Sequence, residues 1–142
     1  MVNALILYQY GVDPERLLGD YLVARSRKTG RIRYIGSNGK LLATIRATDG
    51  LLVPAPPLSE RLAALSDYRV KVNDEAAPYV GKGRTVFAKH VVEAGRSVRP
   101  GDEVVVVDPE MRPIALGKAT LPGPDMEASR RGRAVKTRKG LL

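Results

Sequence analysis

Paired carboxylates are the residues of this chain that could most directly do chemistry. They occur at Asp74-Glu75, at Asp102-Glu103 and at Asp108 with Glu110. General acid/base catalysis needs carboxylates that converge on one pocket with shifted pKa values. These pairs fall at expected turns and helix starts, where acids commonly accept hydrogen bonds from backbone amides. We therefore expect them to cap turns and helices, and we assign no catalytic residue.

The residue inventory restricts nucleophilic and metal chemistry. The 142 residues include no cysteine and a single histidine, His90. Disulfides, cysteine nucleophiles and zinc sites of the Cys/His kind cannot be built from this set. A Ser-His-Asp arrangement would have to use His90, which lies in a β-patterned run and is expected to be a buried or half-buried scaffold residue. No metal site and no cofactor are predicted.

Cationic residues form two blocks in a chain whose net charge is +9. The segment from Arg130 to Leu142 holds six basic residues and no acidic one: Arg130, Arg131, Arg133, Lys136, Arg138 and Lys139. A second block has five cations within nine residues: Arg25, Arg27, Lys28, Arg31 and Arg33. Such blocks either stay solvated or meet a polyanion, which favours nucleic acid as a partner. Tyr34, beside the second block, could stack on a base, but a core tyrosine with a satisfied hydroxyl is the expected role.

A loop with two glycines and two cations, Gly81-Lys82-Gly83-Arg84, adds a third basic feature. Glycine lets backbone amides approach a phosphate closely, and the cations neutralise it. The loop lacks the Gly-Lys-Ser/Thr spacing of a P-loop. The alternative is a surface turn that needs a positive φ.

Bulk composition is that of a globular protein. The hydrophobic fraction is 44%, and no apolar run approaches the roughly 18 residues of a membrane span. Met1 to Tyr10 lacks the basic lead and the cleavage site of a signal peptide. We therefore expect a cytoplasmic protein with no membrane partner.

The first half, residues 1–67, is expected to be a small α/β domain. The pattern predicts a strand over Ala4–Tyr8 and a helix that starts at Asp13 and Pro14 and carries Leu17, Leu18, Tyr21 and Leu22 on one face. Ser37-Asn38-Gly39 predicts a hairpin between strands at 31–35 and 40–46. A short helix is expected from Ser59 to Leu65. The apolar loop from Leu51 to Pro54 could belong to the core or to a partner surface.

The second half, residues 68–142, is expected to be mostly β. Strands are predicted at 69–72, 85–92, 103–107, 114–121 and 133–138, with helical turns at 74–80 and 125–131. The four valines of 104–107 must be buried. Five or six short strands in about 70 residues indicate a closed or nearly closed barrel, because closure removes exposed edges.

Four motifs in this half resemble the PUA domain: Thr85–Val92, Arg99–Val104, Leu116–Ala119 and Arg131–Lys136. The resemblance covers Arg69 to about Gly140 and implies a β pseudo-barrel that binds structured RNA, often the acceptor stem and 3′ end of tRNA. By this resemblance, the RNA surface comprises Tyr79, Gly81, Lys82, Gly83 and Arg84, facing Lys136 and Arg138 and flanked by Arg130, Arg131 and Arg133. The cations Arg27, Lys28, Arg31 and Arg33 of the first half are expected to bind RNA as well. The fold class expected for the whole chain is α+β, a small α/β domain followed by a PUA-type pseudo-barrel.

The first half, from about Tyr8 to Leu65, resembles the domain that precedes the PUA domain in archaeosine tRNA-guanine transglycosylase. Ser26–Arg33, Gly39–Arg46 and Asp49–Leu51 carry this resemblance. In that family a separate barrel domain exchanges a guanine base in tRNA, using acidic residues and a Cys/His zinc site, and the 142 residues hold none of it.

Two functions follow from the resemblances. The chain could be the non-catalytic, tRNA-binding subunit of a split transglycosylase, with the catalytic subunit as its partner. It could instead be a free-standing PUA protein that acts on the ribosome or in translation. A self-contained small enzyme is disfavoured by the missing nucleophile and base.

Overall fold

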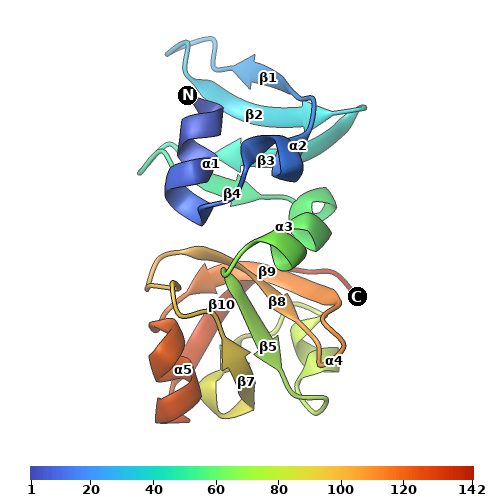
Figure 1. Ribbon diagram of the computed structural model, residues 1–142, viewed down its shortest axis with the longest axis vertical. Helices are drawn as coiled ribbons and strands as arrows, with labels where there is room; N and C mark the ends of the chain where they lie inside the picture. The colour runs from blue at the N-terminus through green and yellow to red at the C-terminus, as the bar shows by residue number, and fades with distance from the viewer.

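The computed structural model describes residues 1–142 as two sheets, one above the other, with the chain passing between them at α3 (Figure 1). The upper sheet is antiparallel, with strand order β1-β2-β3-β4. Helices α1 and α2 lie against it (Figure 1). The elements of this half are α1 (Val2–Tyr10), α2 (Pro14–Leu18), β1 (Leu22–Arg25), β2 (Ile32–Ser37), β3 (Lys40–Ile45), β4 (Leu52–Pro54), the 3₁₀ turn η1 (Pro56–Leu58) and α3 (Ser59–Leu65).

The lower sheet is mixed, with strand order β6-β10-β9-β8-β5-β7. Its strands pair antiparallel except for β5 and β8, which are parallel. The elements are β5 (Arg69–Val72), α4 (Ala77–Val80), β6 (Val86–Phe87), the 3₁₀ turn η2 (Ala88–His90), β7 (Val91–Ala94), β8 (Glu103–Val107), β9 (Pro113–Ala119), α5 (Gly123–Ser129) and β10 (Arg133–Gly140). The α+β class predicted from the sequence is confirmed.

Strands β6 and β7 lie at opposite edges of the lower sheet, yet they are consecutive in the chain and joined only by η2. The sheet must therefore curl until its two edges meet, which produces the expected nearly closed barrel.

The strand predicted over 85–92 is corrected by the structure, which has β6, η2 and β7 in this segment. The segment breaks at η2 because it leaves β10, its partner on one side, and joins β5 on the other.

The strand predicted over Ala4–Tyr8 is wrong, because these residues lie in helix α1. The buried residues of α1 are Val2, Ile6, Gln9 and Tyr10, a spacing that places them on one helical face. A short apolar run does not distinguish strand from helix, and here the neighbouring residues decide. Gly11, with a φ of 64°, ends the helix in the left-handed conformation.

Helix α2 begins as predicted but is shorter. The Asp13 side chain accepts a hydrogen bond from the Glu15 amide at 3.0 Å, and Pro14 follows as the first helical residue. Gly19, at a φ of 62°, ends the helix after Leu18, so Leu22 belongs to β1. The Ser37–Gly39 hairpin is confirmed, with positive φ at both Asn38 and Gly39.

Strand β8 is buried on both faces, and this joins the two halves. Val104 and Val106 point into the barrel core, whereas Val105 and Val107 belong to the core that α1, α2 and α3 form above it. Leu52 and Leu58 complete the upper core. The segment Leu51–Pro54, left undecided by the sequence, is therefore mainly core: Leu52 and Pro54 are buried in β4. No helix of the chain is both long and apolar enough to cross a membrane.

Glu103, at the start of β8, is a buried carboxylate shared by both halves. It is 1% exposed and pairs with Arg46, which follows β3, at 3.1 Å, and with Arg138 on β10. Arg138 also donates to the Pro54 carbonyl at 3.0 Å. The Tyr10 hydroxyl donates to the Glu103 carbonyl at 3.3 Å, and burial raises the pKa of Tyr10. Since a buried charge is tolerated only when it is paired, Glu103 fixes Arg46 and Arg138 to one point.

Glu103→Gln keeps the shape of the side chain but removes its charge. We expect this variant to lower the free energy of unfolding by about 2–5 kcal/mol, since both arginines lose their shared partner. The measurement is urea denaturation. Glu110→Gln is the matched control, because Glu110 pairs with Arg112 on the surface and should matter by about 1 kcal/mol or less. Equal stability of the two variants would contradict the anchoring role of Glu103.

Candidate nucleic-acid interface

A cleft of about 590 Å³ lies between the upper sheet and the barrel. One wall is a row of cross-strand neighbours on β2, β3 and β4: Tyr34 pairs with Thr44, and Thr44 pairs with Val53. The other wall is a row on β8, β9 and β10: Glu103 pairs with Lys118, and Lys118 pairs with Lys136. Because directly paired residues share one face of a sheet, each row presents its side chains together. All six residues line the cleft.

The cleft is strongly cationic. Its lining includes one carboxylate, Glu103, and five cations: Arg33, Arg46, Lys118, Lys136 and Arg138. Glu103 is engaged by Arg46 and Arg138. Arg46 also pairs with Asp49 at 2.8 Å, and its hydrogen bonds to that carboxylate lower the pKa of Asp49. Arg33, Lys118 and Lys136 are exposed and are left without an acidic partner in these ion pairs.

The basic block of the first half joins this cleft through Arg33. Arg27, Lys28 and Arg31 are exposed around the turn between β1 and β2. The Gly30 amide donates to the Ser26 carbonyl at 2.9 Å and the Ser26 amide to the Arg31 carbonyl at 2.8 Å, which closes the turn. A second hollow lies between this turn and the Asp49-Gly50 turn, and it shares Arg33, Ile45, Arg46 and Ala47 with the cleft. The cationic surface is therefore continuous from this turn to β10.

The glycine loop lies at the far end of β10. Tyr79, on α4, is 65% exposed, and Lys82, Gly83 and Arg84 are also exposed. Gly83 has a φ of 104°, as expected for a turn that requires glycine. Gly81 is covered by Leu142, whose amide donates to the Gly81 carbonyl at 2.9 Å. A Cβ on Gly140 would lie 2.4 Å from the Gly81 oxygen, so the end of β10 packs directly on the loop.

The sequence-predicted cations are therefore spread along β10 and do not gather at the glycine loop. Lys136 and Arg138 line the interdomain cleft, and four residues of strand, about 13 Å, separate Lys136 from Gly140. Arg133 lies at the opposite end of the strand, where it pairs with Phe87 of β6. Arg130 and Arg131 are exposed after α5, with Arg130 in the left-handed conformation.

Arg138 has a structural contact that the sequence did not indicate. Its guanidinium holds Glu103 and the Pro54 carbonyl. Arg138→Glu would place two carboxylates together in a partly buried site, so this variant should destabilise the protein as well as change its surface charge. Lys136 is exposed and is the better probe of the surface alone.

The remaining chemistry-bearing residues mostly follow expectation. Asp108 accepts hydrogen bonds from the Glu110 and Arg112 amides, and Asp102 accepts from the Arg99 amide. His90 is half-buried, and its Nδ1 lies 3.4 Å from Nδ2 of the Asn73 side chain. Glu103 is the exception, since it is buried between arginines and caps no turn. Tyr34 also differs from the core role expected of it, because it is 47% exposed.

Sequence reasoning missed Lys118 and Arg46. Lys118 is the exposed member of an otherwise largely buried strand, β9, and a single lysine in an apolar run was the available signal. Its position opposite Lys136 depends on strand register, which the sequence does not show.

Two families match the chain. Residues 1–69 match the patch-forming domain C2 of tRNA-guanine transglycosylase, and residues 68–141 match the PUA domain. The chain is 42% identical over 138 residues to the tRNA-guanine(15) transglycosylase of Methanothermobacter thermautotrophicus, which covers 94% of this chain and 21% of that protein. The chain spans about a quarter or less of the length of the curated relatives it matches first and resembles their C-terminal part.

Two solved structures resemble the whole chain. A hypothetical protein from Pyrococcus horikoshii OT3 has a TM-score of 0.77 and 27% identity, covering 98% of this chain and 87% of that chain. A conserved PUA domain protein from Thermoplasma acidophilum has a TM-score of 0.67 and 25% identity, covering 94% and 83%. Because residues 68–141, just over half of the chain, match the PUA domain, the chain belongs to the PUA family, and the residues ahead of this domain resemble the patch-forming domain C2 of tRNA-guanine transglycosylase.

Proposed function

We propose that this protein binds tRNA, without chemistry of its own, through the continuous cationic surface that runs from the β1–β2 turn across the cleft to β10. The observation that carries the proposal is the pairing of Lys118 directly with Lys136. Like charges opposite each other destabilise a sheet, whereas a phosphate lying between them would be bound by both. The names of the curated relatives, which refer to tRNA, support tRNA as the RNA class.

Recognition by shape is the mode that the surface supports. A-form RNA hides its base edges in a deep major groove, so contacts to phosphates and 2′-hydroxyls dominate on duplex regions. The exposed loop at Lys82, Gly83 and Arg84 offers backbone and cations together, as such contacts require. By the PUA resemblance, the acceptor stem and the 3′ end are the part of tRNA bound. Tyr79 and, at the other end of β10, Arg130, Arg131 and Arg133 are exposed and would extend this surface, whereas Gly81 is buried under Leu142 and would only support the loop.

A catalytic partner chain is the first form of this proposal. In this form a separate subunit would supply the base exchange while this chain holds the tRNA. The names of the transglycosylases, which the chain matches over about a quarter of their length, support it. A free-standing role on the ribosome or in translation is the alternative. Capture of a catalytic transglycosylase subunit by the tagged protein would distinguish the two.

Salt dependence tests the electrostatic basis of binding. If six to ten phosphates are contacted, affinity for whole tRNA should fall by about 10³- to 10⁵-fold between 50 and 200 mM salt. The measurement is a fluorescence-anisotropy titration at several salt concentrations, beside an acceptor-stem minihelix with and without its single-stranded 3′ end. Equal, weak binding to every RNA would contradict tRNA recognition.

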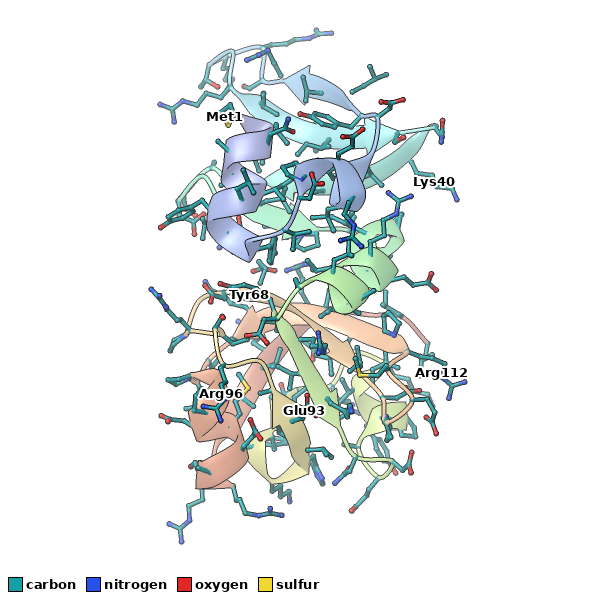
Figure 2. All side chains as sticks on the ribbon, in the orientation of Figure 1. Met1, Lys40, Tyr68, Glu93, Arg96 and Arg112 are labelled. Carbon is teal, nitrogen blue, oxygen red and sulfur yellow. The ribbon has the colours of Figure 1, made fainter.

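Lys136→Glu tests the surface directly. We expect tRNA affinity to fall several-fold or more. The plot of log affinity against log salt concentration should also become less steep, by about the slope of one phosphate contact. The melting temperature should not fall, because Lys136 is exposed and a glutamate there would face Lys118. Lys40→Glu is the matched control, because Lys40 is an exposed lysine at the tip of the β2–β3 hairpin (labelled in Figure 2). Arg33, near the start of β2, and Arg46, just after β3, lie at the other end of this hairpin. A similar loss in both variants would indicate a general charge effect and would remove Lys136 from the site.

A further inference from the structure

The two walls of the interdomain cleft differ in chemistry. The upper wall offers an aromatic ring, Tyr34, which is 47% exposed. The guanidinium of Arg33 lies 5.9 Å from the centre of this ring, within the range of a cation–π contact. Thr44, Ile45 and Val53 continue this wall with apolar surface. A large exposed aromatic ring beside a cation is the combination on which unpaired bases stack.

The lower wall offers two lysines that form no ion pair in the protein, Lys118 and Lys136. Lys118 and Lys136 are direct neighbours on antiparallel strands, so their Cβ atoms lie about 4.5–5.5 Å apart. Glu103 is the next residue in the row, but both of its oxygens are held by Arg46 and Arg138. Neither lysine has a carboxylate within ion-pair distance, and an anion bound there would meet two cations at once.

The size of the cleft limits what it holds. Its volume, about 590 Å³, lies in the range of about 300–1,000 Å³ found for small-molecule sites. A duplex presents phosphates but no free base face, so it would use the lysines and leave Tyr34 without a partner. A single-stranded segment presents both groups within one nucleotide.

We propose that this cleft binds an unpaired nucleotide of the RNA, with the base stacked on Tyr34 and the adjacent phosphate between Lys118 and Lys136. This inference rests on the proposed function, since it locates a second contact on the same RNA. The site is separate from the glycine loop, because Lys136 lies about 13 Å along β10 from Gly140. Single-stranded and duplex regions of one RNA would thus meet different parts of the protein.

The test uses two RNA hairpins of identical stem, one blunt and one with a four-nucleotide single-stranded 3′ tail that carries 2-aminopurine. For the natural chain, the tail should increase affinity, and the fluorescence of 2-aminopurine should be quenched on binding. Tyr34→Leu should remove this gain, a loss of about 5- to 150-fold for one stacked base, while the affinity for the blunt hairpin stays the same. Lys118→Gln should weaken the binding of the tailed hairpin more than that of the blunt one.

Two controls separate stacking from other effects. Tyr34→Phe keeps the ring and should keep the gain, and Tyr8→Leu removes an exposed tyrosine on α1 and should have no effect. A tail that adds no affinity, or a gain that survives Tyr34→Leu, would overturn the cleft as a nucleotide site while leaving tRNA binding intact. If neither hairpin and no tRNA binds at low salt, the proposed function fails, and this inference fails with it.

Discussion

Burial of strand β8 on both faces is the constraint on which the rest of the structure depends. Alternate valines enter the barrel core and the upper core, so neither half can move away without exposing one row to water. Glu103 fixes the orientation of the two halves, because Arg46 from the upper half and Arg138 from the barrel must both reach its side chain. The apolar rows supply affinity between the halves, and the ion pairs fix their orientation. The walls of the cleft, which come from different halves, are therefore held at a constant separation.

The junction of the two halves also decides which cations keep a carboxylate partner inside the protein. The acids Asp13, Asp102 and Asp108 accept hydrogen bonds from backbone amides, and Asp49 and Glu103 pair with arginines in their neighbourhood. These carboxylates stabilise turns or the junction of the two halves. Tyr68 marks this junction in Figure 2. Arg46 and Arg138 are used in these pairs, whereas Arg33, Lys118 and Lys136 in the same cleft make no ion pair with a carboxylate. These cations account for part of the net charge of +9.

Local signals in the sequence predict much of the fold. The Asp13-Pro14 cap, the Asn38-Gly39 turn and the four valines of β8 each depend on residues within a few positions, and the structure confirms them. The errors concern features set by distant partners. Ala4–Tyr8 becomes helix because Val2, Ile6 and Tyr10 face the upper core, and residues 85–92 break because their two ends pair with β10 and β5. For the same reason Lys118 was missed and Tyr34 was assigned to the core, since strand register places both in the cleft.

Strand β10 shows how a rigid element can organise recognition of a flexible polyanion. Its eight residues span about 26 Å, with Arg133 at one end, Lys136 in the middle and Gly140 packed against the glycine loop at the other. Pairing with β9 and, at its start, with β6 keeps these groups at fixed spacing. A bound RNA must match this spacing or lose contacts, because the strand cannot shorten or bend without breaking its ladder. Under the proposed function, selectivity for the shape of an RNA would then follow from the barrel itself, without any side chain that reads base edges.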